Sequence, residues 1–221
     1  MKILVVGDSV VFGRPKYSIY YSLTWPAILS ESGAFVMQRA RGGSGMSDVK
    51  KELKMLEGYF VDDLTIEKDN KFDFCFIQAG IVDVTPRILT RKIRILLSRT
   101  RIGGRLVKKL NSNRYLISKL GRPDVDQNTF FEHASEVYRL GNLMASKVIF
   151  IGIAPPFNNL IINCGNFSSD VTQYNSVLEK VSNGDVLYID KSQENFLPDG
   201  YHFTKKGHSV IGKKLLSIIS D

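Results

Sequence analysis

The sequence predicts a three-layer α/β fold in which a parallel sheet of five strands is covered by helices on both faces. Five short runs rich in Val, Ile and Phe are mostly continuous rather than alternating, as expected of strands buried on both faces. Segments with apolar residues at helical spacing separate these runs, and such alternation is typical of doubly wound sheets. The length of 221 residues fits one domain, residues 1–221, that buries its own core.

The expected strands contain many β-branched and aromatic residues, which favour the pleated conformation. In chain order they cover residues 2–6, 35–39, 72–78, 147–153 and 185–190. Cys75 lies inside the third run, so we expect it to be a buried, reduced thiol. With Cys164 as the second cysteine, the chain has too few for a disulfide framework.

Helices are expected between the strands, where apolar residues recur every three or four positions. They cover residues 19–32, 47–59, 130–145, 170–182 and 204–220. Thr204 is expected to cap the last helix, because a threonine hydroxyl accepts a hydrogen bond from a backbone N–H of the first turn.

A long segment between the third and fourth strands exceeds what a single connecting helix needs. Its apolar residues fall at helical spacing in two groups, one around Leu96 and one around Leu106. Because glycine weakens helices, we expect Gly103 and Gly104 to separate the two groups. The sequence therefore predicts a pair of amphipathic helices, an insert over residues 87–122 that forms a lid or side arm.

The insert carries the excess positive charge of the protein. The formal net charge is +8, and 12 of the 30 Lys and Arg residues, but none of the 22 acidic ones, lie between Arg87 and Arg122. Three interpretations stay open: a solvated pair of helices, a surface that docks on an anionic membrane, or a site for an anionic substrate or acidic partner. Nucleic acid is not expected, because Tyr115 is the one aromatic residue available for stacking.

Composition also restricts cofactors and location. His133, His202 and His208 show no metal-ligand spacing, and we expect neither a metal nor another cofactor. No window approaches 18 consecutive apolar residues. The apolar run after Lys2 is too short for a signal peptide, so we expect a cytoplasmic protein, or one at the inner face of a membrane if the insert binds lipid.

Two fragments near opposite ends of the chain supply the groups for nucleophilic acyl transfer. Gly7-Asp8-Ser9 directly follows the first strand, and Asp199-Gly200-Tyr201-His202 directly precedes the last helix. A serine hydroxyl needs an adjacent base, and the base needs a group that fixes its tautomer. Ligands of doubly wound sheets bind beyond the carboxyl ends of the strands, which is where Ser9 falls. We therefore expect Ser9, His202 and Asp199 to act together.

With two further segments, these fragments resemble the four sequence blocks of the SGNH (GDSL-like) hydrolase family over nearly the whole chain. Gly7-Asp8-Ser9 matches the block of the nucleophile, and Asp199-x-x-His202 matches the last block. Residues 40–45 (Ala-Arg-Gly-Gly-Ser-Gly) resemble the second block, which implies that the backbone N–H groups of Ser9 and Gly45 bind the oxyanion. The resemblance also implies the flavodoxin-like strand order 2-1-3-4-5 in a single hydrolase domain.

The third block of the family, Gly-x-Asn-Asp, corresponds here to Gly80-Ile81-Val82-Asp83. Val82 cannot supply the side-chain donor that the family asparagine provides, and we expect the guanidinium of Arg87 to replace it or to bind an anionic substrate group. Asp83 is expected to orient this loop near the substrate. The stretch from Val82 to Arg87 resembles a branch with the sequence Val-Asp-x-x-Pro-Arg, found in glycan-biosynthesis loci, which implies a carbohydrate acyl ester as substrate.

Three functions follow from this pattern. The first is a serine-dependent esterase that removes a small acyl group, such as acetyl, from a sugar or glycan. The second is an O-acyltransferase that uses the same residues and passes the acyl group to a glycan hydroxyl. The third is a catalytically impaired module that binds a glycan, an alternative suggested by Val82.

Overall fold

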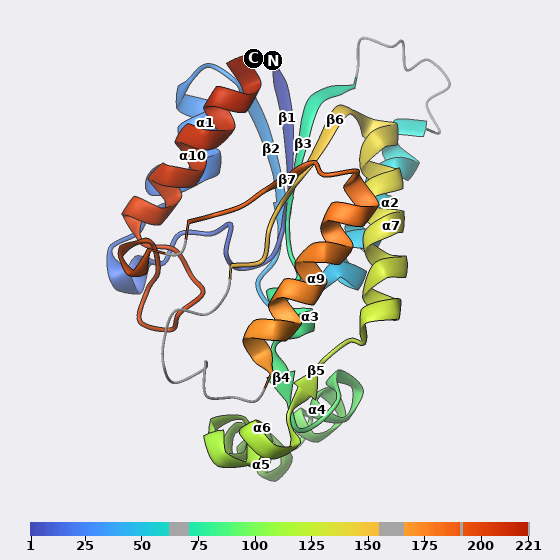
Figure 1. The fold of residues 1–221 in the computed structure, drawn as a ribbon, viewed down its shortest axis with the longest axis vertical. Coiled ribbons are helices and arrows are strands. Elements are labelled where there is room, and N and C mark those ends of the chain that lie inside the picture. The colour runs from blue at the N-terminus through green and yellow to red at the C-terminus, as the bar shows by residue number, and fades with distance from the viewer. Residues whose placement is uncertain (62–70, 155–165, 191, 221) are drawn as a thin grey trace.

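The computed structural model describes residues 1–61, 71–154, 166–190 and 192–220, and Cys164 lies outside these ranges. Five parallel strands form the main sheet in the order β2-β1-β3-β6-β7 (Figure 1). Their bounds are β1 Lys2–Gly7, β2 Phe35–Ala40, β3 Phe72–Gln78, β6 Ala145–Ile151 and β7 Val186–Leu187. The predicted doubly wound sheet and its strand order are confirmed.

Helices cover both faces of this sheet (Figure 1). One face carries α1 Trp25–Glu31 and α10 Lys205–Ser220, and the other carries α2 Met46–Val61, α7 Gln127–Met144 and α9 Phe167–Ser182. The first helix begins later than residue 19, because Pro26 is tolerated only in the first turn of a helix. The residues before it form the short 3-10 turns Pro15–Tyr17 and Tyr21–Leu23. A further short 3-10 turn, Gln193–Asn195, precedes the last block.

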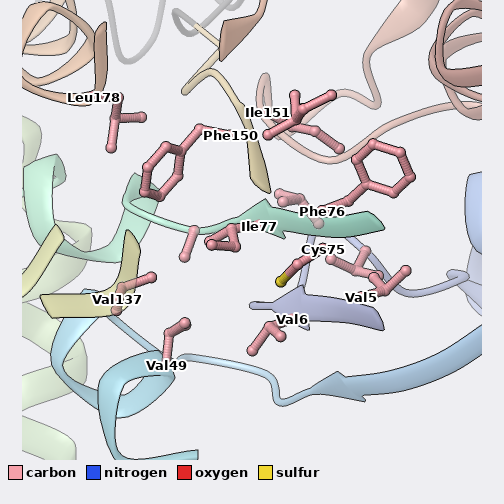
Figure 2. Packing of buried hydrophobic residues seen from close by; sticks show 14 of the residues in the cluster. Val5, Val6, Val49, Cys75, Phe76, Ile77, Val137, Phe150, Ile151 and Leu178 are labelled. Atoms are coloured by element: carbon pink, nitrogen blue, oxygen red, sulfur yellow. The ribbon is translucent and has the colours of Figure 1, made fainter. Parts of the chain in front are cut away.

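The core lies on both sides of the sheet. Figure 2 shows side chains of the central strands meeting the helices through Val49, Val137 and Leu178. Phe76 and Phe150 are fully buried, as the continuous apolar strands predict. Cys75 is buried as expected, and burial raises the pKa of its thiol to about 12, so this cysteine is an inert part of the core.

The segment between β3 and β6 begins with the short helix α3 Ile81–Val84 and then leaves the body of the domain. Two-residue strands β4 Pro86–Arg87 and β5 Arg122–Pro123 pair antiparallel and form a stem. Beyond the stem lie α4 Arg91–Ser98, α5 Arg101–Ser112 and α6 Arg114–Leu120. We call residues 86–123 the arm. It lies past the carboxyl edge of the sheet (Figure 1).

The arm corrects one prediction, because Gly103 and Gly104 lie inside α5 and do not separate two helices. The break falls at Thr100, whose side chain caps α5 by accepting a hydrogen bond from the N–H of Gly103 at 3.0 Å. A Cβ on Gly103 would lie 2.2 Å from the carbonyl oxygen of Leu97. The glycine is therefore needed where α5 passes close to α4, rather than to break the helix. A second cap, Asn113, accepts from the N–H of Leu116 and starts a third helix.

Within the described parts of the chain, every helix is too short or too polar to cross a lipid bilayer.

Candidate active site

Ser9 lies in a tight turn at the carboxyl end of β1. The turn is fixed by Asp8, whose N–H donates to the carbonyl of Gln78 at 3.0 Å and whose Oδ1 accepts from the N–H of Val10 at 2.9 Å. A Cβ on Gly7 would lie 2.3 Å from the carbonyl oxygen of Gln78, so glycine is required for β1 to approach β3 at this point. The turn thus holds Ser9 at the edge that the sequence predicts.

The last block folds into a compact turn ahead of α10. Asp199 Oδ1 accepts from the N–H of His202 at 3.0 Å, and Gly200 takes a positive φ of 84° that glycine favours. The hydroxyl of Thr204 accepts from the N–H of Gly207 at 3.1 Å and caps α10, as predicted. The cap and the turn together fix the backbone of His202 relative to the helix.

Side chains from the two ends of the chain meet at this edge. Ser9 Oγ lies 3.0 Å from His202 Nε2, and His202 Nδ1 lies 2.7 Å from Asp199 Oδ2. Partial burial alone would raise the pKa of Asp199, but hydrogen bonds from the ring and the backbone N–H of His202 hold it below its usual value. An ionised Asp199 favours the tautomer with the proton on Nδ1, which leaves Nε2 free to accept the proton of Ser9.

Arg14 is a further residue of this site, and the sequence pattern gave no signal for it. Its Nη2 donates to the carbonyl oxygen of Ser9 at 3.2 Å and contacts His202 Nε2. The backbone of Arg14 pairs with that of Ile19 in a β-bridge. This close approach requires glycine at position 13, because a Cβ there would lie 2.6 Å from the carbonyl oxygen of Ile19. A guanidinium therefore shares the imidazole nitrogen with the hydroxyl of Ser9.

The predicted oxyanion donors differ in availability. The N–H of Ser9 has no hydrogen-bond acceptor among the described residues. The N–H of Gly45 instead donates to Asp48 Oδ2 at 3.1 Å, and the same oxygen pairs with Arg91 at 2.8 Å. In the structure Gly45 is thus committed to the first turn of α2. Gly42 of the same loop approaches the nucleophile, since a Cβ there would lie 3.9 Å from the Cβ of Ser9.

Asp83 supports the loop of Gly45 and makes no hydrogen bond to Ser9 or His202 in the described structure. Its Oδ2 accepts from the N–H of Met46 at 2.7 Å, and a Cβ on Gly45 would lie 2.4 Å from its Oδ1. Burial raises the pKa of Asp83 to about 7, partly offset by the bond from Met46. Val82 packs against the core and supplies no polar group.

Arg87 approaches the site from the stem of the arm, on the side of Tyr201. The ring of Tyr201 lies against the ring of His202, with centroids 4.5 Å apart. Burial and then Asp199 raise the pKa of Tyr201, whereas the charges of Arg87 and Arg14 lower it, so both guanidinium groups lie within electrostatic reach of this ring. In the described structure no hydrogen bond joins Arg87 to Ser9 or His202, and its buried Nε has no partner.

Two hollows lie near the carboxyl end of β1, and neither is lined by Ser9, His202 or Asp199. A small cavity of about 20 Å³ is lined by Ile81, Ile153, Ala154 and Tyr201, next to the turn of Ser9. A larger hollow of about 570 Å³ runs from Gly7 along β2 and α2, and its mixed lining includes polar side chains such as Gln38 and Glu52 and apolar ones such as Val49 and Met55. The described residues contain no group of His, Cys, Asp and Glu side chains that could hold a metal ion.

No protein-family model and no curated protein sequence matches the chain. Solved structures match its fold over nearly its whole length. A lipolytic protein of the G-D-S-L family from Veillonella parvula has a TM-score of 0.63 at 13% identity and covers 100% of this chain and 98% of its own. A lipase/acylhydrolase from Enterococcus faecalis has a TM-score of 0.58 at 18% identity, covering 99% and 94%.

A psychrotrophic esterase from Pseudoalteromonas sp., solved in a form inhibited by monoethylphosphonate, has a TM-score of 0.58 at 12% identity and covers 99% of this chain and 96% of its own. At these identities the comparisons show a shared fold.

Proposed function

We propose that the protein is a serine-dependent carboxylic ester hydrolase. The observation that carries this proposal is the chain of contacts from Ser9 Oγ through the ring of His202 to Asp199. These contacts join a nucleophile, a base and a group that orients the base, which is the minimal set for ester cleavage through an acyl-enzyme. The fold shared with esterases and lipases supports the same reaction class.

In the first half-reaction, Ser9 Oγ bonds to the acyl carbon while its proton passes to His202 Nε2. The carbonyl oxygen becomes an oxyanion. Collapse of this intermediate breaks the bond to the alcohol, whose oxygen takes the proton from Nε2. A water molecule then repeats both steps on the acyl-enzyme and releases the acid, which restores Ser9. Asp199 stabilises the imidazolium in each step.

The N–H of Ser9 is the oxyanion donor that is free of other partners in the described structure. We propose Gly45 as the second donor, used once Asp48 gives up its hydrogen bond. Arg87 is proposed to compensate for the missing asparagine or to bind a negative charge of the substrate. In the first role, Arg87→Ala should lower turnover more than substrate binding; in the second, it should mainly weaken substrate binding. Asp83 is proposed to act only by holding the Gly45 loop.

The two hollows support a substrate with a small acyl group on a sugar. A cavity of about 20 Å³ has room for little more than a methyl group, since one water molecule needs about 10–15 Å³. The hollow of about 570 Å³ is large enough for sugar rings, and the polar side chains in its mixed lining suit hydroxyl groups. We therefore propose an acetylated sugar or glycan as the substrate.

A fluorescent alkyl phosphonate tests the reaction class, because it forms a stable bond only with an activated serine. We expect the label on Ser9, no label in Ser9→Ala, and labelling slowed at least 100-fold in His202→Ala. Equal labelling of wild type and His202→Ala, or labelling of another serine, would contradict the proposal.

An O-acyltransferase would use the same residues, with a glycan hydroxyl in place of water. Acyl transfer from acetyl-CoA to an added acceptor, faster than hydrolysis, would assign that function. A binding module is a second candidate, because Val82 gives no donor and Asp48 holds the N–H of Gly45. Glycan binding without phosphonate labelling would assign it.

A further inference from the structure

We infer that the arm docks on the surface of an anionic lipid bilayer. This inference goes beyond the proposed ester chemistry and does not depend on it. It is carried by the combination of unpaired positive charge and exposed apolar side chains on α4, α5 and α6.

Most of the positive charge of the arm has no ion-pair partner among the described residues. Arg91 and Arg94 pair with Asp48 and Asp124 and attach α4 to the domain. Eight other basic side chains are exposed and form no ion pair with any described residue. These are Lys92, Arg99, Arg101, Arg105, Lys108, Lys109, Lys119 and Arg122. The arm contains no acidic residue, so this surface is complementary to a negatively charged partner.

Large apolar side chains are exposed among these charges. They are Ile93, Ile95, Leu96, Ile102, Leu106, Tyr115 and Leu120, with Ile102 at 81% and Tyr115 at 64% exposed. A surface that only keeps the arm in solution would have polar residues here. Contiguous exposed apolar side chains instead mark a surface that meets a partner or a membrane.

Helix α5 shows the arrangement most clearly. Gly103 and Val107 face inward and are buried, while Ile102 and Leu106, one turn apart, share an exposed face. Arg105 and Lys109 lie beside that face at the same helical spacing. Apolar side chains flanked by long cations are the pattern of helices that lie in the plane of a membrane interface, because the cations reach the lipid headgroups.

The arm is held firmly enough to act as one surface. Val107 and Ile117 are each 8% exposed and form a small core between its helices, separate from the core of the domain. The ion pair of Arg91 with Asp48 at 2.8 Å ties the arm to the start of α2. Because the arm extends beyond the carboxyl edge of the sheet, a docked arm places the turn of Ser9 on the membrane side of the protein (Figure 1).

Lipid fits this surface better than nucleic acid does. Single-stranded nucleic acid needs several aromatic platforms for its bases, and the arm offers only Tyr115. Nucleic acid also leaves Ile102 and Leu106 without an apolar partner. A bilayer with anionic headgroups satisfies both features at once, since each cation near its surface and each buried apolar group adds to binding.

The test is co-sedimentation of the full chain with vesicles of phosphatidylcholine, alone or with phosphatidylglycerol. We expect binding to the anionic vesicles at low salt, weakened by high salt, and none to phosphatidylcholine alone. Lys108→Gln/Lys109→Gln should lose about 25-fold in affinity, about fivefold for each charge. The matched control Lys205→Gln/Lys213→Gln removes the same charge from exposed positions of α10 and should bind like wild type.

Ile102→Ser/Leu106→Ser tests the apolar part and should reduce binding at least tenfold without changing the net charge. No binding at low salt, equal binding to neutral vesicles, or equal losses in the α10 control would overturn the inference. A concentration-dependent dimer abolished by Ile102→Ser/Leu106→Ser, without vesicle binding, would assign the surface to a second copy of the chain. Ser9→Ala should bind vesicles like wild type, so this test is independent of the proposed catalysis.

Discussion

Two donors approach the same imidazole nitrogen in this site. The hydroxyl of Ser9 must donate to His202 Nε2 for attack, yet the guanidinium of Arg14 contacts that atom as well. A guanidinium carries no acceptor and stays protonated, so it cannot take part in proton transfer. It also repels the imidazolium that forms during the reaction. An anionic group on the substrate would draw Arg14 away and offset its charge.

This geometry predicts opposite effects of Arg14→Gln on two substrates. For a neutral ester such as p-nitrophenyl acetate, we expect kcat to rise severalfold, because the lone pair of His202 becomes free for Ser9. For an acetyl ester whose alcohol part carries a carboxylate or phosphate, we expect kcat/KM to fall roughly 10-fold to 100-fold, since a charge-assisted hydrogen bond is lost. Steady-state kinetics on both esters make the comparison. Losses of equal size on the two esters would show that Arg14 only supports the fold.

Asp8, next to the nucleophile, predicts a dependence of stability on pH. Its carboxyl is fully buried, Oδ2 has no hydrogen-bond partner in the described structure, and burial raises its pKa to about 7. Because the folded protein holds this proton more tightly than the unfolded chain, the stabilisation is complete below the ordinary pKa of about 4 and is lost as the pH rises through 7.

Asp8→Asn keeps the acceptor for the N–H of Val10 and cannot ionise. Relative to wild type, we expect its free energy of unfolding to increase by about 2 kcal/mol between pH 5 and pH 8. Urea unfolding at both pH values measures this difference. Burial lowers the pKa of His208 to about 4, so its contribution to stability changes with pH in the opposite sense. This contribution is the same in both proteins and cancels in the comparison with wild type. A difference that stays constant with pH would mean that Asp8 does not titrate in this range.

Single residues were predictable from the sequence where a local motif carries them. Ser9, Asp199 and His202 stand in short patterns directly beside a strand and a helix, and the fold then brings them together. Arg14 stands in no such pattern. Its position follows from the turn at Gly13 and the bridge between Arg14 and Ile19, a local loop geometry that residue spacing alone does not reveal.

At the level of elements, the start of α2 links the loop of Gly45 to the arm. One carboxylate oxygen of Asp48 accepts from the N–H of Gly45 and also pairs with Arg91 of α4. The loop of Gly45 is further pressed against the buried carboxyl of Asp83. The loop therefore has little freedom, and a small change there should affect both stability and turnover.

Alanine substitutions of two glycines, one at each end of α2, test whether the loop of Gly45 has little freedom. Gly45→Ala places a Cβ 2.4 Å from Asp83 Oδ1 and should lower stability by roughly 1–3 kcal/mol and reduce ester turnover. Gly58→Ala meets nothing within 4 Å and should raise stability by about 0.5–1 kcal/mol with turnover unchanged. Thermal unfolding and ester kinetics on both variants give the comparison. Unchanged stability in Gly45→Ala would mean that Asp83 can move aside without cost.

The sequence predicted most elements to within a few residues, because a buried strand or an amphipathic helix is a local pattern. The arm was harder. Two of its helices begin where the side chains of Thr100 and Asn113 cap them. Gly103 allows a close approach between α4 and α5, which the helix propensity of a single residue does not predict. The sequence thus predicted that the arm is helical, whereas the number of its helices depends on how they pack.

At the level of the whole molecule, the alternation of strands and helices predicted a doubly wound sheet, and the resemblance of the sequence blocks to a known family predicted its strand order. Structures at 12% to 18% identity share this fold, so it tolerates nearly complete exchange of side chains as long as the buried pattern is kept. The carboxyl edge then assembles the site from the turn of Ser9, the loop of Gly45 and the segment before α10. The single-domain extent of residues 1–221 and the substrate remain proposals beside this fold.

Removal of the arm at its stem would separate the proposed ester cleavage from the proposed membrane binding. Pro86 faces Pro123 and Arg87 faces Arg122 across only two ladder positions, so the chain enters and leaves the arm at one point. An Asn-Gly turn could close that hairpin directly after residues 88–121 are excised. The protein that lacks residues 88–121 would have a slightly negative formal charge instead of +8. It would therefore bind to anion-exchange resin, whereas the full chain binds to cation-exchange resin. Chromatography would thus resolve the two forms of the same catalyst in one mixture.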